Sequence, residues 1–324
     1  MIARFPHESR LSRRRALGVA AMVPAAMAGI APIRGHAQED VPESSPANTN
    51  PSPVIVNLVQ YVHPEKTYFW VSGFADDTVR AGLYGLDVAA YVAVKADFAA
   101  AARGAAAALL ADESFARQVD RLPFERNAVV VVIGESDTDS LQSWFEIVRH
   151  LLELRRPDDG IQLVNNGISA LTTTQAFSPY VPVLAMQPDW IFCALGANDA
   201  LRIGPEPNKT LVSLEETTRN LAELRRLADF ATDARWVWLT RMPIDVPRME
   251  AYEPFQMGPV PFVWRNADVE AINGWIREQP ETVNDIYAGF GNPAPQDYQE
   301  PDGLHPTLAG HQVLAQEFVW RLAG

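Results

Sequence analysis

Apolar runs alternate with amphipathic stretches along the second half of the chain. Residues 128–133 form a continuous run of mostly β-branched apolar side chains, as expected for a strand that is buried on both faces. Residues 141–154 then place apolar side chains at helical spacing. The same reasoning predicts further strands at 161–164, 189–195, 236–240 and 283–287, and helices at 214–230, 269–276 and 306–322, the last with Pro306 in its first turn.

Such repeated βα units predict a parallel sheet with helices on both faces. We therefore expect an α/β protein in which residues 128–324 form a three-layer sandwich around a mainly parallel five-stranded sheet. In sheets of this kind, ligands bind at the carboxyl ends of the strands. The loops that follow the strands are therefore where functional residues are expected.

The segment before this domain has a different pattern. Residues 38–53 are rich in Pro, Ser, Asn and Glu and predict a flexible linker, whereas residues 54–127 predict a largely helical extension that packs on the main domain. Within it, residues 54–59 have the pattern of a strand. Residues 86–110 predict one or two Ala-rich helices rather than a membrane span, because charged side chains interrupt every long apolar run. We find no catalytic motif in this extension.

The first 37 residues have the pattern of an export signal. Arg13, Arg14 and Arg15 precede an apolar run up to residue 33, and Gly35-His36-Ala37 then supplies small residues for a signal peptidase. The alternative is an uncleaved membrane anchor, but the run is short and broken by Gly and Pro. We expect cleavage after Ala37 and a periplasmic or secreted protein exported through the twin-arginine route.

Charge and cysteine content narrow the function further. The chain carries a net charge of −13, and removing residues 1–37, with six Arg and one Glu, makes it −18. Such an acidic protein is not expected to bind nucleic acid or anionic membrane surfaces. Cys193 is the single cysteine and lies in a predicted strand, which excludes an intrachain disulfide and indicates a core residue.

Two short motifs carry residue types suited to nucleophilic catalysis. Ser136 follows the first predicted strand, with Gly134 and Glu135 before it, although a serine in this position is also a common helix N-cap. Asp302 precedes His305 by three residues just before the last predicted helix. A histidine oriented by a nearby carboxylate can act as the base that activates a serine hydroxyl.

Two further loops carry candidate donors for an oxyanion. Gly167 lies after the second predicted strand and could offer its backbone N–H, and Asn198 lies after the third and could offer its side-chain amide. Each motif by itself is also an ordinary turn or loop. Their order, one after each successive strand, is what gives them weight.

Together these segments resemble the SGNH (GDSL-like) hydrolase family over residues 128–324, most specifically in the run Asp302-Gly303-Leu304-His305-Pro306. The resemblance implies a flavodoxin-like fold and a serine esterase. It further implies a triad of Ser136, Asp302 and His305, and an oxyanion hole made by Ser136, Gly167 and Asn198. Glu135 replaces the usual Asp before the nucleophile, and Ala170 replaces a second glycine of many members.

The expected reaction is ester hydrolysis through an acyl-serine, without a cofactor or a metal ion. The histidines His63, His150 and His311 form no ligand pattern with Cys193. Expected substrates are small acyl esters, with O-acetyl groups on carbohydrate among them. An O-acyltransferase with the same triad and a catalytically silent ligand-binding protein are the alternatives.

The acyl chain length depends on an aromatic loop between residues 242 and 264. This loop contains Tyr252, Phe255, Met257, Phe262 and Trp264, which would either wall an acyl pocket or pack the loop onto the domain. Tyr68, Phe69 and Trp70 have the same two alternatives, a pocket wall or packing onto the domain.

Overall fold

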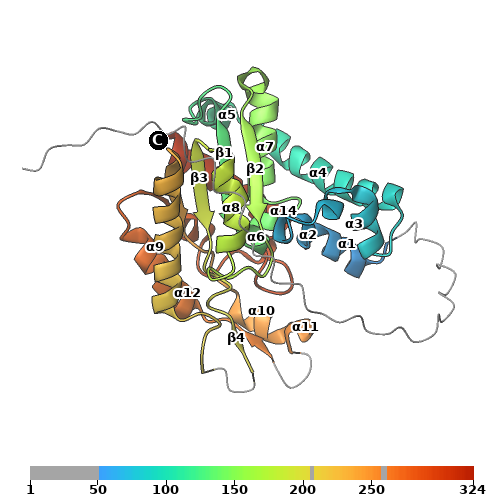
Figure 1. The fold of residues 1–324 in the computed structure, drawn as a ribbon, viewed down its shortest axis with the longest axis vertical. Helices are drawn as coiled ribbons and strands as arrows, with labels where there is room; N and C mark the ends of the chain where they lie inside the picture. Colours follow the sequence, from blue (N-terminus) through green and yellow to red (C-terminus); the bar gives the residue numbers. More distant parts are fainter. Residues whose placement is uncertain (1–50, 205–207, 257–260) are drawn as a thin grey trace, which may run out of the picture. The chain divides into compact units, whose positions relative to one another are not determined.

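The computed structural model describes residues 51–204, 208–256 and 261–324, drawn in colour in Figure 1. These residues belong to one unit, which spans Ala47–Gly324. The expected export signal at residues 1–37, and residues 38–50 of the expected linker, lie outside the described residues. The linker boundary differs by one residue, because Pro53 already belongs to a helix.

A parallel five-stranded sheet forms the centre of the fold, as the sequence predicted. Its order is β2-β1-β3-β5-β7, and each neighbouring pair is parallel. The strands are β1 (Val129–Gly134), β2 (Gln162–Gly167), β3 (Trp190–Ala194), β5 (Arg235–Leu239) and β7 (Thr282–Asn284). The predicted fifth strand at 283–287 is partly wrong, since β7 ends at Asn284 and α13 (Ile286–Phe290) follows.

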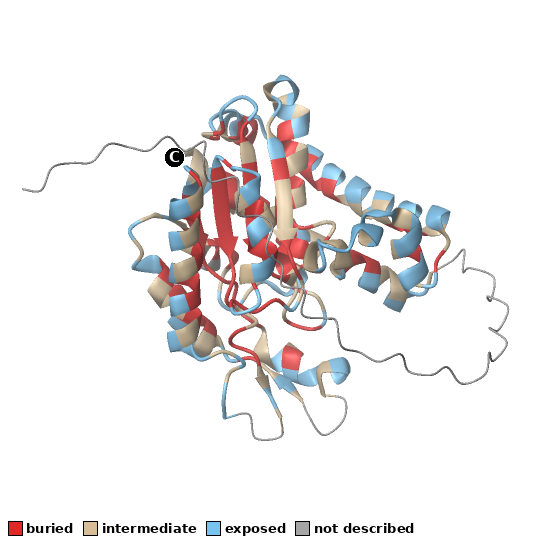
Figure 2. Cartoon of the chain, viewed as in Figure 1, coloured by how far each residue is buried: buried red, intermediate tan, exposed pale blue. Residues whose placement is uncertain are grey.

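Alternate side chains of the strands enter two separate cores, which confirms the three-layer arrangement. Val130 and Val132 of β1 point to one face, and Val131 and Ile133 point to the other. The first face is covered by α4 (Val88–Leu110), α5 (Glu113–Asp120), α7 (Trp144–Arg155) and α14 (Leu308–Ala323); the second is covered by α8 (Phe177–Ala185), α9 (Leu214–Ala231) and α12 (Asn266–Arg277). Figure 2 shows the resulting burial of the strands and of the inner helix faces.

The N-terminal extension is helical, as expected, but the predicted strand at residues 54–59 is wrong. This segment forms α1 (Pro53–Tyr61), which begins with a proline in its first turn and with a hydrogen bond from the N–H of Ile55 to the Ser52 hydroxyl, 3.4 Å long. The extension continues through α2 (Pro64–Thr67), the 3₁₀ turn η2 (Ser72–Ala75), α3 (Asp77–Leu83) and α4. Residues 86–110 therefore contain one helix.

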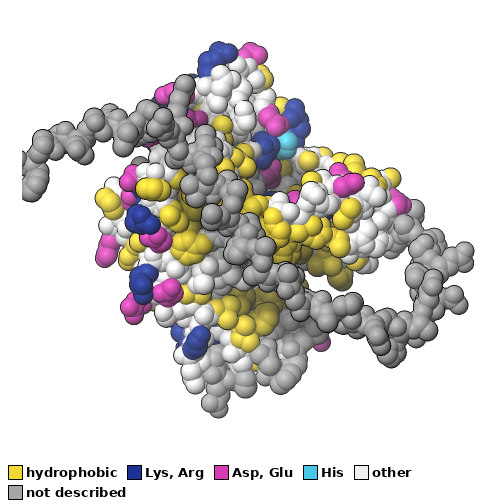
Figure 3. Space-filling model, viewed as in Figure 1, with side chains coloured by type: hydrophobic (Ala, Val, Ile, Leu, Met, Phe, Trp, Pro, Cys, Tyr) yellow, Lys and Arg dark blue, Asp and Glu magenta, His cyan; other side chains and the backbone are white. Residues whose placement is uncertain are grey.

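The extension has its own small core, because α1, α3 and α4 bury apolar side chains against each other. The members are Val59, Ala81, Leu86, Tyr91 and Val94. Other apolar side chains stay exposed and contribute to the yellow surface over these helices in Figure 3. Tyr68, Phe69 and Trp70 are exposed, with 60% of Trp70 accessible to solvent, so these aromatics do not pack into a core.

Helix starts follow their capping side chains. Ser143 accepts a hydrogen bond from the N–H of Glu146 at the start of α7, and Thr307 accepts one from Gly310 at the start of α14. Pro306 therefore precedes the last helix and does not lie in its first turn, contrary to the prediction. No helix in the described part of the chain is both long and apolar enough to cross a membrane.

The remaining elements lie around the ends of the strands. They are α6 (Ser136–Asp139), η3 (Pro157–Asp159), β4 (Arg202–Ile203), α10 (Val246–Ala251), α11 (Glu253–Gln256), β6 (Phe262–Val263) and η4 (Gln296–Tyr298). The antiparallel pair β4–β6 and helix α8 have no counterpart in the sequence prediction. The β4–β6 pair joins the loop after β3 to the aromatic loop.

Candidate active site

The carboxyl ends of β1, β2 and β3 lie at the same level of the sheet. Gly134, the last residue of β1, is in register with Gly167 of β2 and with Ala194 of β3. The chain turns sharply after Gly134, since a Cβ atom at this position would lie 2.6 Å from the Thr138 hydroxyl. The three loops that carry the predicted functional residues consequently begin side by side.

Ser136 is the first residue of the one-turn helix α6, and Glu135 occupies the N-cap position. The alternative role of Ser136 as a helix cap is therefore wrong. Its Oγ lies 2.9 Å from Nε2 of His305, and Nδ1 of that histidine lies 2.6 Å from Oδ2 of Asp302. The structure thus brings together the three residues predicted for the triad, from opposite ends of the domain.

The turn between Asp302 and His305 holds this geometry. Oδ1 of Asp302 accepts hydrogen bonds from the N–H groups of Leu304 (2.8 Å) and His305 (2.9 Å), so its second oxygen is directed at the imidazole. Gly303 between them has a φ of +67°, and a Cβ atom there would lie 2.5 Å from the carbonyl oxygen of Asp245. Only glycine fits this position without strain.

The charges of the triad match the chemistry of a general base. Burial would lower the pKa of His305, but the hydrogen bond and the negative charge of Asp302 outweigh it, so the pKa lies above that of an ordinary imidazole. Burial would raise the pKa of Asp302, but His305 and the two backbone N–H groups hold it below the ordinary value. Asp302 is therefore ionised at neutral pH and stabilises a protonated His305.

Two of the three predicted oxyanion donors are available. The N–H of Ser136 has no acceptor among the described residues. The side-chain amide of Asn198 donates one hydrogen bond to the carbonyl of Leu171 (3.2 Å) and keeps a second N–H. Asn198, Ser136 and His305 line the same small cavity.

The structure gives the predicted donor Gly167 a different partner. Its N–H donates to Oδ1 of Asn165, 2.9 Å away, and is not free for an oxyanion. A glycine is needed here for another reason, because a Cβ atom would lie 2.6 Å from the backbone nitrogen of Asp139 in α6. The absence of a side chain at Gly167 therefore allows α6, which begins with Ser136, to lie close to the end of β2.

Ala170, in the same loop, has a backbone N–H that differs from those of its neighbours. The N–H groups of Ile168, Ser169 and Leu171 donate to Gly134 O, Asp139 Oδ2 and Ile168 O respectively. The N–H of Ala170 has no acceptor in the part of the chain that the structure describes. Its φ of +60° is unusual for a residue with a side chain.

Glu135, one of the two residues that depart from the pattern of the resembled family, orders the loop after β3. Its buried carboxylate accepts hydrogen bonds from the N–H groups of Gly196 (2.8 Å), Ala197 (3.2 Å) and Asn198 (3.2 Å). Burial raises the pKa of Glu135 to about 8, against the opposing charge of Arg241. The longer side chain therefore spans from the nucleophile turn to the backbone that carries Asn198.

Sequence reasoning missed the cation under this site. Arg241 follows β5, is buried, and pairs with Asp137, the residue directly after Ser136. Its Nη1 donates to the carbonyl of Ala194 (2.9 Å), and its Nη2 lies 3.7 Å from Oε2 of Glu135. The sequence does contain an indication of this ion pair, because Arg241 follows one apolar strand while Glu135 and Asp137 follow another.

The cavity beside the triad is small, about 30 Å³. Met242, Ile244, Trp264 and Leu304 line it together with the polar residues. From the aromatic loop, Trp264 thus reaches the site, and its indole N–H donates to the carbonyl of Ala197 (3.0 Å).

The rest of the aromatic loop packs mainly within itself. The ring of Phe255 lies 5.0 Å from that of Tyr252, 6.3 Å from that of Phe262 and 5.7 Å from that of Trp264, centroid to centroid. Met257 lies outside the described residues. Of the four aromatic residues, Trp264 alone lines the cavity beside Ser136, and all four pack the loop together.

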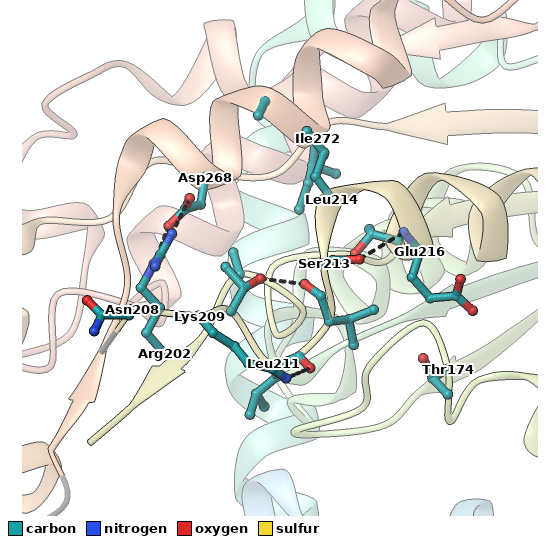
Figure 4. A pocket seen from close by; sticks show the side chains of 15 residues that line it. Thr174, Arg202, Asn208, Lys209, Leu211, Ser213, Leu214, Glu216, Asp268 and Ile272 are labelled. Carbon is teal, nitrogen blue, oxygen red and sulfur yellow. Dashed lines mark hydrogen bonds and ion pairs between the residues drawn. The ribbon is translucent and has the colours of Figure 1, made fainter. Parts of the chain in front are cut away.

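A larger hollow of about 830 Å³ lies elsewhere, between the loop after β4 and helices α9 and α12 (Figure 4). Arg202 in its wall forms an ion pair with Asp268 at 2.8 Å, and Ser213 caps α9. Its described lining contains none of the five predicted site residues. Within the described residues, no group of three or more His, Cys, Asp or Glu side chains is arranged to hold a metal ion.

Cys193 is buried in β3, as predicted, and burial raises the pKa of its thiol to about 12. The thiol is therefore protonated and serves as a core side chain.

Comparison with known proteins adds a family assignment. The sequence pattern of the GDSL-like Lipase/Acylhydrolase family matches residues 132–313, and no curated protein matches the chain. Similar solved structures include LAE5, an alpha/beta hydrolase enzyme from the metagenome of Lake Arreo, Spain, with 21% identity, 62% of this chain and 97% of that chain covered, and a TM-score of 0.49. Axe2, an acetylxylan esterase from Geobacillus stearothermophilus, has 21% identity, 61% and 95% coverage, and a TM-score of 0.46.

The family match extends over more than half of the chain. It includes the loops after β1, β2 and β3 and the turn that holds Asp302 and His305. The chain belongs to the GDSL-like lipase/acylhydrolase family and is a serine hydrolase that acts on ester bonds.

Proposed function

We propose that this protein hydrolyses esters of small acyl groups, with Ser136 as nucleophile and the pair Asp302–His305 as its base. One observation carries the proposal: Ser136 Oγ lies 2.9 Å from His305 Nε2, while His305 Nδ1 lies 2.6 Å from Asp302. Both distances are those of formed hydrogen bonds. Two consecutive hydrogen bonds thus connect the nucleophile to the base and the base to the carboxylate that orients it.

The reaction follows from these contacts. His305 Nε2 takes the proton of Ser136 as Oγ attacks the ester carbonyl, and the resulting imidazolium is stabilised by Asp302. His305 then returns the proton to the leaving alcohol, which departs and leaves an acyl-serine. Water, deprotonated by His305, then attacks the acyl-serine, and His305 returns this proton to Ser136 Oγ as the acid leaves.

The oxyanion formed in each half-reaction needs donors that are not otherwise used. The N–H of Ser136 and the second amide N–H of Asn198 meet this requirement, and we assign the third donor to the N–H of Ala170 in place of Gly167. Glu135 supports this arrangement through its three hydrogen bonds to the backbone of residues 196–198.

The size of the cavity supports a small acyl group. About 30 Å³ is close to the volume that one water molecule occupies in the liquid, and the walls are formed by Met242, Ile244 and Trp264. An acetyl group is larger than one water molecule, but it needs far less widening of this space than an octanoyl chain does. O-acetyl groups on carbohydrate are one substrate class of this kind. The sequence of residues 12–37 further supports export to the periplasm or the medium.

The test is a comparison of p-nitrophenyl acetate, butyrate and octanoate as substrates, together with labelling by a fluorophosphonate followed by intact mass and peptide mapping. We expect hydrolysis that is fastest on acetate, and a single label on Ser136. A label on another residue, or a folded protein that turns over none of the three esters and takes no label, contradicts the proposal. Preference for octanoate overturns the small-acyl part alone.

The side chain of Asn198 gives a first specific expectation. Asn198→Ala should lower kcat by about 10²–10³, because one oxyanion donor is lost, with a much smaller change in KM. Asn166→Ala is the matched control, since the amide of Asn166 donates to the carbonyl of Pro179 (3.3 Å) near the same edge of the sheet. Equal rates for the two variants would remove Asn198 from the oxyanion hole.

The raised pKa of His305 gives a second expectation, read from pH profiles. His305 must be neutral to act as base, so kcat/KM should rise with pH through an apparent pKa above the ordinary value for imidazole. Asp302→Asn removes the partner that favours the charged form, so it should move this pKa downward and lower kcat by about 10³–10⁴.

Glu300→Gln provides the comparison for this profile. The backbone N–H of Glu300 donates to the carbonyl of His305 (2.8 Å) and is kept in this variant, whereas the Glu300 side chain raises the pKa of His305 through its charge, less than Asp302 does. A small downward shift with kcat preserved is therefore expected. If Asp302→Asn leaves the ascending limb unchanged, His305 is not the group that titrates.

A further inference from the structure

A buried carboxylate joins the nucleophile turn, which we define as residues 135–139, to the loop that follows β2. Asp139 is the last residue of α6, and only 1% of its side chain is exposed. Its Oδ2 accepts hydrogen bonds from the backbone N–H of Ser169 (2.8 Å) and from the Ser169 hydroxyl (3.0 Å). The backbone N–H of Asp139 donates to the carbonyl of Glu135 (2.7 Å). Asp139 therefore fixes the position of Ser169 relative to the turn that carries the nucleophile.

The other oxygen of Asp139 is held by the N-terminal extension. Lys66 Nζ and His63 Nδ1 each lie 2.6 Å from Oδ1. Lys66 makes a second contact across the same junction, because its Nζ also donates to the carbonyl oxygen of Gly167 (3.0 Å). A single ammonium group thus bridges the end of the nucleophile turn and the start of the loop with residues 167–171.

These contacts have an electrostatic consequence. Burial would raise the pKa of Asp139, but the charge of Lys66 and the hydrogen bond of His63 hold it below the ordinary value. An ionised Asp139 accepts from both donors of Ser169, the residue before Ala170. Lys66 therefore contacts both sides of this loop start: the Gly167 carbonyl directly, and Ser169 through Asp139.

The extension also packs on the base itself. The ring of Tyr61 lies 5.0 Å from the ring of His305, and the carbonyl of Gln60 accepts a hydrogen bond from the N–H of Leu141, just after α6 (3.2 Å). Helices α1 and α2 therefore contact the nucleophile turn, the following loop and the base. All three contacts come from residues that precede the family match, which begins at residue 132.

We propose that Lys66 is a positioning residue for catalysis, which holds residues 167–171 through Asp139 and Gly167 so that the Ala170 N–H faces the oxyanion. This inference rests on the proposed function, since it assumes that Ala170 is a donor. It gives the N-terminal extension a part in the active site. The active site would then include a residue from outside the part of the chain that matches the family, residues 132–313.

The experiment compares kcat and KM of Lys66→Met and wild type on p-nitrophenyl acetate. We expect kcat to fall about tenfold or more, since complete loss of an oxyanion donor costs about 10²–10³, while KM stays within about twofold. Lys66→Arg keeps the positive charge and hydrogen-bond donors and should recover most of kcat. A purely structural role of Lys66 predicts lower stability with an unchanged kcat for the folded fraction.

Lys95→Met is the matched control in the same extension. Lys95 pairs with Asp77 at 3.2 Å and lies over the ring of Tyr91, and Asp77 also pairs with Arg80, so these contacts stay within α3 and α4. It should have the kcat of wild type. If Lys66→Met also has this kcat, or loses as much as Lys66→Arg, the inference is overturned.

Ser169→Ala tests the same link from the other side, in case Lys66→Met does not fold. It removes one donor to Asp139 and retains the backbone N–H, so we expect a several-fold lower kcat at unchanged KM. An unchanged kcat for Ser169→Ala would then overturn the inference. Fluorophosphonate labelling of Ser136 in wild type separates this outcome from failure of the proposed function, because labelling stays intact if only the role of Lys66 is wrong.

Discussion

Ser136→Ala is expected to abolish measurable ester hydrolysis, with kcat lower by about 10⁴–10⁶. Without Oγ, no acyl-enzyme can form, and the 2.9 Å contact to His305 Nε2 has no proton to transfer. The residual rate should be that of water attack assisted by the oxyanion donors. The measurement is steady-state hydrolysis of p-nitrophenyl acetate, with intact mass to show that the variant takes no fluorophosphonate.

Ser140→Ala is a demanding control for this prediction. Ser140 directly follows α6, is buried, and accepts a hydrogen bond from the side chain of Gln60 (3.0 Å), but it has no contact with His305. It should label normally and keep most of its activity, while the free energy of unfolding falls by about 1 kcal/mol. Substantial turnover by Ser136→Ala, with no wild-type contamination, would exclude Ser136 as nucleophile.

The parts of the fold that could be predicted are those set by local pattern. Residues 128–133 predict β1 because a strand covered on both faces must be apolar at every position, and parallel topology then brings the loops after β1, β2 and β3 together. The spacing of Asp302 and His305 likewise predicts their contact, since both lie in one tight turn.

Where local preference and packing disagree, the prediction is wrong. Residues 54–59 are rich in β-branched side chains, yet they form α1 because Ser52 caps it, Pro53 begins it, and Val59 is buried against α3 and α4. Tertiary context overrides a propensity difference of well under 1 kcal/mol per residue.

Contacts between distant segments could not be predicted from one sequence. Lys66 meets Asp139 and Gly167 across 73 and 101 residues, and the charge and length of a lysine side chain do not indicate either partner. The sequence also does not show that residue 167 must be glycine because α6 lies so close to it. Nor does it show that Ala170, rather than Gly167, has a backbone N–H without an acceptor among the described residues. A glycine in a loop indicates space or conformation, and only the structure separates these from a donor role.

Arg241→Met should destabilise the fold by about 3–5 kcal/mol, because it leaves the carboxylate of Asp137 buried without its cation. The backbone at this position is fixed independently: the N–H of Arg241 donates to the Asn273 side chain (2.7 Å), and its carbonyl accepts from the same amide (2.9 Å). The loss therefore reports on the guanidinium. The measurement is the free energy of unfolding from urea titration at neutral pH.

Arg235→Met provides the comparison at the other end of β5. Arg235 is exposed and stacks on Trp190 with its guanidinium 5.1 Å from the ring centroid, so its replacement should cost about 0.5–1 kcal/mol. The double variant Arg241→Met with Asp137→Asn should recover part of the lost stability, since Asp137→Asn removes the charge that Arg241→Met leaves unpaired. Equal losses for Arg241→Met and Arg235→Met would show that the buried cluster does not hold the nucleophile turn and the loop after β3 together. A large loss confined to Arg241 would show that this side chain stabilises the junction on which Ser136, Glu135 and Asn198 are placed.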